Sequence, residues 1–102
     1  MASRLKLQEE LENVLGSRNV YFQPPESVKL QYDAIVYSLS NDYVRHADNK
    51  PYMVLDRYDI TVISKNPDND IAKRIKEYFK YSSFDRRFIT ENLYHDTLTI
   101  YY

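Results

Sequence analysis

The sequence predicts an α+β fold, with a mainly antiparallel sheet of four to five strands and two helices packed on one face. Two segments carry apolar residues at helical spacing, and the other apolar segments are short and rich in β-branched and aromatic residues. Neighbouring strands are joined by a hairpin or through one helix, which favours antiparallel pairing. The 102 residues suffice for one domain, spanning residues 1–102.

The N-terminal segment, residues 4–15, spaces its leucines and valine as one buried helical stripe among charged and amide residues. Gly16 follows, at the position where the end of a helix favours a left-handed residue. Residues 19–23 have the Val-Tyr-Phe content of a short extended segment, which Pro24 ends because proline cannot donate to a strand ladder. Residues 24–30 are predicted to be irregular.

Two longer strands are predicted in the middle of the chain. Residues 34–40 are apolar on both faces, as in a central strand, and residues 52–65 are the longest strand candidate. Residues 41–51 between them are polar and rich in turn-forming types, and about eleven residues are long for a hairpin connection. We expect a loop here that carries function, because long loops on rigid sheets often do.

The C-terminal part begins with turn and helix-capping residues at 66–70, and a second helix is predicted over residues 71–80. Residues 83–102 predict a hairpin that turns near residues 90–92. Its second strand runs to Tyr102. The chain is therefore expected to stop inside a sheet rather than in a solvated tail.

Composition narrows the functional classes. The chain has 14 basic and 15 acidic residues, a formal net charge of -1, and no global basic field of the kind that draws proteins to nucleic acid or to anionic membranes. It has no cysteine, so disulfides and thiolate zinc sites are excluded, and its single glycine excludes glycine-rich phosphate loops. No apolar run approaches the roughly 20 residues that span a bilayer. We expect a soluble, intracellular protein without cofactors or membrane contact.

Catalytic patterns are equally sparse. His46 lies near Asp42 and Asp48, but their spacing matches no metal-binding loop signature and favours a solvated loop. His95 and Asp96 are adjacent in a predicted strand, so they point to opposite faces and cannot form a base and its orienting carboxylate. A structural hydrogen bond of His95 is the preferred interpretation. We therefore expect no catalytic residue and no metal site, and predict that the protein is not an enzyme.

One basic cluster lies on the second predicted helix and shortly after it, and comprises Lys73, Arg74, Lys76, Lys80, Arg86 and Arg87. Lys73, Lys76 and Lys80 share one outward face at helical spacing, which is typical of a solvated helix face. Contact with nucleic-acid phosphates is the alternative. Glu77 and Asp85 lie within the cluster and weaken that alternative.

Tyrosine is the most distinctive residue type, with 11 copies. Its apolar ring and polar tip suit half-buried sheet faces and protein interfaces equally. Tyr101 and Tyr102 are adjacent in a predicted strand, so if one enters the helix-covered core, the other faces a partner or solvent. An oligomer interface is the resulting expectation.

The pattern of strands and turns resembles small tailed-phage proteins described as tail terminators or head-to-tail joining proteins. The segments that carry the resemblance are Asn-Val-Tyr-Phe-Gln-Pro-Pro (19–25), Ala-Ile-Val-Tyr (34–37), Arg-Tyr-Asp-Ile-Thr-Val-Ile (57–63), Asn-Pro-Asp (66–68), Ser-Phe-Asp-Arg (83–86) and Asn-Leu-Tyr-His-Asp (92–96). They cover most of the chain. They are structural patterns and include no catalytic motif.

The resemblance implies a ring-forming protomer, typically of a hexamer, in the virion tail or neck. The ring would cap the tail tube, stop its polymerisation and meet the neck or head connector protein, while DNA passes through the channel without specific binding. Assembly would take place in the host cytoplasm. A head-completion or neck ring protein is the first alternative, and a small nucleic-acid-binding domain is the second. The inferred contact residues, on the 41–51 loop and on sheet edges, are Asp42, Tyr43, Arg45, His46, Arg86, Arg87, Tyr101 and Tyr102.

Overall fold

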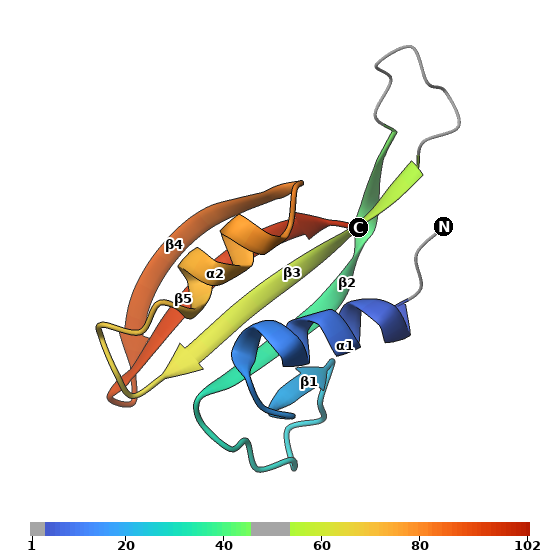
Figure 1. Ribbon diagram of the computed structural model, residues 1–102. Helices are drawn as coiled ribbons and strands as arrows, with labels where there is room; N and C mark the ends of the chain where they lie inside the picture. Colours follow the sequence, from blue (N-terminus) through green and yellow to red (C-terminus); the bar gives the residue numbers. More distant parts are fainter. Residues whose placement is uncertain (1–3, 46–53) are drawn as a thin grey trace.

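The computed structural model describes residues 4–45 and 54–102 and has the predicted α+β fold (Figure 1). Within these residues, the helices and strands are α1 (Arg4–Leu15), β1 (Val20–Phe22), β2 (Ala34–Arg45), β3 (Val54–Ser64), α2 (Ile71–Tyr78), β4 (Ser82–Thr90) and β5 (Leu93–Tyr101). The strands form one five-stranded sheet in the order β1-β2-β3-β5-β4. β1 pairs with β2 in parallel, and the other neighbouring strands are antiparallel.

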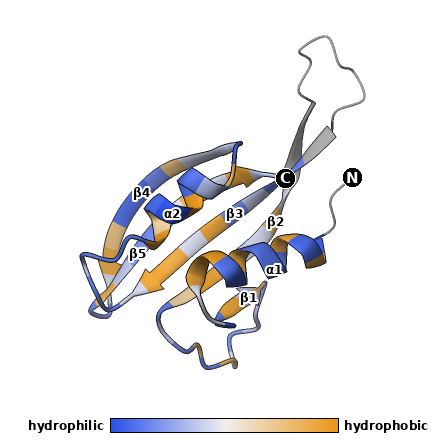
Figure 2. Cartoon of the chain, viewed as in Figure 1, coloured by the Kyte–Doolittle hydropathy of each residue, from blue (hydrophilic) through white to orange (hydrophobic). Residues whose placement is uncertain are grey.

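Both helices cover the same face of the sheet (Figure 1). α1 buries Leu7, Leu11 and Val14, at the spacing of a single helical stripe, and α2 buries Ile71 and Ile75. The alternation of orange and blue along the two helices in Figure 2 follows this amphipathic pattern. The two predicted helices are therefore confirmed. The faces expected to be buried are confirmed in part, because Leu5 of α1 and Tyr78 of α2, which helical spacing places on these faces, are 67% and 52% exposed.

The core lies between the helices and the three central strands. Tyr37 of β2, Ile60 of β3 and Leu98 of β5 form one register row across these strands, and each is almost completely buried. Ile100 and Phe79 extend the core toward the end of α2. Burial of such side chains contributes roughly 1.5 to 3 kcal/mol each, so this row is a principal source of stability.

Two helix ends follow their local sequence. Gly16 has a φ of +85°, and its N–H donates to the carbonyl of Glu12 (2.8 Å), as expected for a left-handed residue that ends a helix. Before α2, the side chain of Asn69 accepts a hydrogen bond from the backbone N–H of Ile71 (3.2 Å). α2 ends at Tyr78 because Phe79 is already extended, two residues before the predicted end.

The prediction of a loop over residues 41–51 is wrong for its first part. β2 continues to Arg45, so Asp42, Tyr43 and Arg45 lie on a strand, and β3 is described from Val54. His46, the fourth predicted contact residue of this loop, lies outside the described residues. Pairing with β3 overrides the weak strand preference of this polar segment, since strand propensity depends strongly on context.

The placement of Tyr101 and Tyr102 at a sheet edge is also wrong. β5 lies between β3 and β4, so the last strand of the chain is an inner strand. The edge strand of the terminal hairpin is β4, which carries Arg86 and Arg87. The prediction that the chain stops inside the sheet is confirmed, because Tyr102 exchanges two backbone hydrogen bonds with Asp56 of β3 (2.9 and 3.2 Å).

Candidate interaction surfaces

The β2–β3 hairpin reaches past the rest of the sheet. Tyr43 pairs with Asp56 and Arg45 with Val54, after a register shift that follows Leu39. We call residues 43–45 and 54–56 the β2–β3 arm. Two of the predicted contact residues, Tyr43 and Arg45, lie on its β2 strand, and a third, Asp42, directly precedes it.

The arm is supported by the sheet only at its base. On the β3 side, the chain that forms β5 reaches only as far as Tyr102, which pairs with Asp56. On the β2 side, the pairing of β1 ends at Phe22, which lies opposite Tyr37. Among residues 4–45 and 54–102, no third strand flanks the arm beyond Asp56. Figure 1 shows the two strands of the arm separating from the body of the protein.

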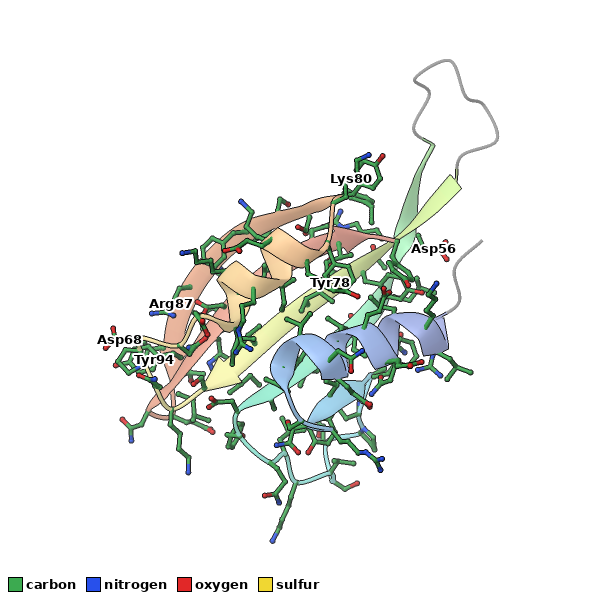
Figure 3. The ribbon with its side chains drawn as sticks, viewed as in Figure 1. Asp56, Asp68, Tyr78, Lys80, Arg87 and Tyr94 are labelled. Atoms are coloured by element: carbon green, nitrogen blue, oxygen red, sulfur yellow. The ribbon has the colours of Figure 1, made fainter. Side chains whose placement is uncertain are left out.

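Arg87 lies on the edge strand β4, yet its guanidinium is used within the chain. Nε and Nη2 donate to the two carboxylate oxygens of Asp96 (2.6 and 3.0 Å), and Nη1 donates to the carbonyl of Pro67 (2.7 Å). The hydrogen bond to Asp96 raises the pKa of Arg87. Figure 3 shows Arg87 beside Tyr94 and Asp68, at the end of the sheet where the β3–α2 connection passes. Through these hydrogen bonds, Arg87 holds the segment between β3 and α2 against the sheet.

Arg86 has a different environment. Its guanidinium lies 5.0 Å from the centre of the Phe88 ring, and that ring stacks on His95 at 4.8 Å. His95 Nδ1 lies 3.2 Å from the carbonyl oxygen of Leu93, in line with the structural role predicted for it. This set lies on the sheet face opposite the helices, and Arg86 remains exposed there.

Asp85 forms a bulge that separates these two environments. Phe84 pairs with Leu98, whereas Arg86 already pairs with Thr97. The extra residue reverses the alternation, so Phe84 and Arg87 share the helix-covered face although they are three positions apart. Strict alternation along the strand would have placed Phe84 on the same sheet face as Arg86. The neighbours of Phe84 could therefore not be predicted from the sequence.

Tyr102 completes the core of its own chain. Its ring packs against Phe79 with a centroid distance of 6.1 Å, and its hydroxyl donates to Glu10 of α1. Tyr78 donates to the other oxygen of the same carboxylate (3.1 Å) and lies between the two helices in Figure 3. Burial, followed by the hydrogen bond to Glu10, raises the pKa of Tyr102. Tyr101, its neighbour, points to the helix-free face and is half-buried.

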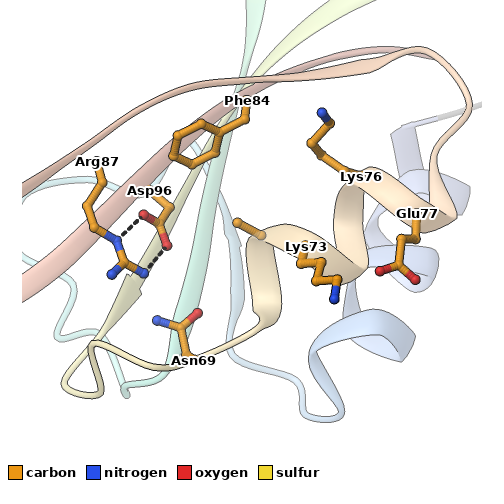
Figure 4. Close-up of a pocket in the computed structure, with 8 residues that line it drawn as sticks. Asn69, Lys73, Lys76, Glu77, Phe84, Arg87 and Asp96 are labelled. Carbon is orange, nitrogen blue, oxygen red and sulfur yellow. Dashed lines mark hydrogen bonds and ion pairs between the residues drawn. The ribbon is translucent and has the colours of Figure 1, made fainter.

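A groove lies between α2 and β4, with a volume of about 630 Å³. Its lining residues are Asn69, Ala72, Lys73, Lys76, Glu77, Phe84, Arg87 and Asp96. Phe84 is 44% exposed and forms an apolar patch on the strand side, while Lys73 and Lys76 rise from the helix side (Figure 4). We call this the α2/β4 groove.

The basic cluster predicted from the sequence contains side chains without an ion pair and side chains that contact other parts of the chain. Lys73 and Lys76 are exposed and make no ion pair with any described residue. Arg74 pairs with Asp70 (3.1 Å) and donates to the carbonyl of Val14 (2.7 Å), which ties α2 to the end of α1. The cluster therefore offers a smaller basic surface than its composition indicates.

Two further observations bear on the functional class. Among the described residues, no group of three or more histidine, cysteine, aspartate or glutamate side chains is arranged to hold a metal ion. In the same part of the chain, no helix has the length and apolar character needed to cross a membrane.

Comparisons with known proteins add no family assignment, because no family model and no curated protein matches the chain.

Proposed function

We propose that this protein is a structural virion protein of a tailed phage, a tail terminator that caps the tail tube as a ring and joins it to the head connector. The proposal rests on the resemblance of the strand and turn segments described above. The observation of the structure that supports it most directly is the β2–β3 arm, which extends from a compact sheet and carries residues 43–45.

The arm suits a protein that works in an assembly. A two-stranded ribbon is only marginally stable by itself in water, because no third strand or helix packs against it. Contact with a neighbouring protomer or with the tail tube would supply the missing packing. In the proposed ring, the arm is the element that reaches the adjacent component, and the sheet with its two helices is the rigid body.

A ring also requires two different, complementary surfaces on each protomer. The α2/β4 groove with Phe84, Lys73 and Lys76 offers one surface at the edge of the sheet. The partners in this proposal are other copies of the chain, typically six in the ring, together with the tail tube protein and the connector. DNA passes through without specific contacts.

A nucleic-acid-binding domain is the competing function, supported by the free lysines of the groove. Its signature would be a DNA mobility shift that weakens steeply with salt and is lost in a Lys73→Gln, Lys76→Gln double variant. The matched control is Lys29→Gln, since Lys29 is exposed and lies far from α2 in the chain. A shift that depended on Lys73 and Lys76 would favour this function over the structural one.

Electron microscopy of particles assembled without this protein tests the proposal. Overlong or headless tails are expected for a tail terminator. Tailless, filled heads would instead assign the protein to the neck, as a head-completion or ring protein. Normal particles would refute the virion role altogether.

Light scattering with the purified chain, combined with binding to isolated tail tubes, is a second test. A monomer at high concentration that also fails to bind tubes contradicts the proposal.

A further inference from the structure

Exposed apolar side chains lie near both edges of the sheet. Among the described residues, the large apolar side chains that are most exposed are Leu5, Val28, Tyr32, Leu39, Tyr78, Phe84 and Ile89. None of these seven belongs to β3 or β5, which are inner strands of the sheet. These exposed side chains form two groups. One group lies on α1, on β2 and on the segment after β1, and the other lies on α2 and β4.

The two edges are far apart in the sheet order. β1 forms one edge and β4 the other, with three strands between them. Figure 1 shows the segment of residues 23–33 beside β1, at the end of the molecule remote from β4. A contact that joins these two ends must therefore involve two copies of the chain.

The surface at the β4 end is concave. The α2/β4 groove has the exposed ring of Phe84 on one wall and the free cations of Lys73 and Lys76 on the other (Figure 4). Arg87 and Asp96 close one end of the groove as an ion pair, so their charges balance each other. Glu77 also lines the helix side, so the two lysines there leave one positive charge in excess. The groove therefore favours an occupant with one apolar side chain and a negative charge.

The surface at the β1 end is convex and has this chemistry. Residues 25–28 form a turn in which the N–H of Val28 donates to the carbonyl of Pro25 (3.0 Å). Glu26 and Ser27 occupy its tip and are exposed, and Val28 is 39% exposed. An apolar side chain and a carboxylate thus stand two positions apart on a projecting turn.

The outer edge of β4 is poorly suited to the simplest alternative, strand pairing with a second β4. The bulge at Asp85 interrupts the regular ladder. An antiparallel pair centred on β4 would also bring Arg86 opposite its own copy, and like charges directly opposite each other destabilise a strand pair. These features direct a partner toward the groove instead.

We infer that the 25–28 turn of one copy docks in the α2/β4 groove of the next, with Val28 against Phe84 and Glu26 beside Lys73 and Lys76. The contact is heterologous, so its repetition closes a ring when the rotation between copies allows it. This inference rests on the proposed ring function and identifies the surfaces that build the ring.

Disulfide trapping tests the contact cleanly, because the natural chain has no cysteine. A Ser27→Cys, Glu77→Cys double variant places one thiol on the turn and one at the groove. After mild oxidation at high protein concentration, we expect a ladder of covalent multimers on a reducing-agent-free gel. An equal mixture of the two single variants should stop at dimers, because each copy then carries one end of the contact only.

The matched control is a Ser27→Cys, Ser83→Cys double variant. Ser83 is exposed on β4 but pairs with Thr99, on the sheet face opposite the groove. This variant should form no ladder. If this control variant formed as strong a ladder as the Ser27→Cys, Glu77→Cys variant, the inference would be overturned. Strong dimer formation by the Glu77→Cys single variant would also overturn it, because it indicates a two-fold contact.

Charge reversal provides a second measurement. Glu26→Lys, or Lys73→Glu with Lys76→Glu, should weaken self-association about tenfold in sedimentation experiments, since like charges then face each other across the contact. The triple variant should recover most of that loss. Because all three side chains are exposed, thermal unfolding should be unchanged in each variant, which separates an interface effect from misfolding.

The outcomes distinguish this contact from the ring itself. An oligomer by light scattering that is insensitive to these charges and gives no Ser27–Glu77 ladder keeps the ring and overturns the docking surfaces. A chain that stays monomeric under all conditions and does not bind tail tubes overturns both.

Discussion

Arg87 on the edge strand donates two hydrogen bonds to the carboxylate of Asp96 on the neighbouring inner strand, and the Asp96 side chain is only 2% exposed. A carboxylate buried this deeply requires compensation from a cation, because its transfer out of water is costly. The third hydrogen bond of Arg87, to Pro67, connects the same pair to the segment before α2. A residue that the sequence indicated as an interface arginine thus stabilises the fold.

Replacement of Arg87 by alanine should lower the free energy of unfolding by about 2 kcal/mol. Loss of a partner from a fully buried pair costs roughly 3 to 5 kcal/mol, and the partial exposure of Arg87 reduces this figure. Urea denaturation measures the change. Arg86→Ala is the control, with an expected loss of at most about 1 kcal/mol, because Arg86 contributes one exposed contact to Phe88.

A double-mutant cycle separates the ion pair from the other contacts of Arg87. In an Asp96→Ala background, Arg87→Ala should cost clearly less than in the natural protein, since the buried charge is already gone. Equal losses in the two backgrounds would show that the Pro67 hydrogen bond, rather than Asp96, accounts for the effect.

Stability should decrease as the pH rises above about 10. Burial raises the pKa of Tyr37, Tyr58 and Tyr102 above the ordinary value of 10. The hydrogen bond to Glu10 does the same for Tyr78. A raised pKa means that the folded protein keeps protons which the unfolded chain has released. The stabilisation is therefore complete below pH 10 and is lost as the pH rises through the folded-state pKa values. Urea denaturation between about pH 9 and 11 measures the slope.

Glu10→Gln should make this alkaline loss shallower, because the carboxylate of Glu10 contributes to the raised pKa of both Tyr78 and Tyr102. Glu9→Gln is the matched control, since Glu9 is the exposed neighbour on the same helix. If both variants showed the natural slope, Glu10 would have no part in the alkaline transition.

Tyr37→Phe should lower the free energy of unfolding by about 1 to 2 kcal/mol, because it leaves a half-buried acceptor without its donor. The Tyr37 hydroxyl donates to Gln8 Oε1 (2.5 Å) and accepts from Arg4 (3.3 Å), so it attaches α1 to the sheet. Tyr32→Phe is the control. Tyr32 is exposed, and within the described part of the chain its hydroxyl has no hydrogen-bond partner, so its replacement should cost less than about 0.5 kcal/mol. Equal effects of the two substitutions would mean that the hydroxyl of Tyr37 does not hold α1 in place.

Two leucines on α1 provide a test of its packing. Leu7 is completely buried and Leu5 is 67% exposed, although they stand two positions apart. Leu7→Ala should cost roughly 2 to 5 kcal/mol, and Leu5→Ala less than about 0.5 kcal/mol. Thermal or urea unfolding distinguishes them. Similar losses at the two positions would contradict the orientation of α1 on the sheet.

The elements that were predicted correctly depend on neighbours in the chain. The stripe of α1 follows from helical periodicity, and the end of α1 follows from the conformational freedom of Gly16 at positive φ. The extent of β2 was underestimated because residues 41–45 have a weak strand preference of their own. Their strand conformation comes from the partner strand β3, which is a non-local effect.

The candidate surfaces were predicted less well than the fold. Alternation along the strand correctly placed Tyr101 and Tyr102 on opposite faces, but their inner position depends on β4 pairing outside β5. The bulge at Asp85 then reverses the faces that alternation assigns within β4. No residue near Phe84 in the sequence indicates that it faces the lysines of α2.

The sequence by itself determined the fold class, the two helices with most of their buried residues, and the hairpin that ends within the sheet, because periodicity, capping and turn chemistry act over a few residues. Only the tertiary structure decided which strand lies at the edge, that Arg87 pairs with the buried Asp96, and that Phe84 forms a groove with Lys73 and Lys76. The physical reason is that strand order and bulges bring together residues distant in the chain, and local propensities carry no information about such pairings.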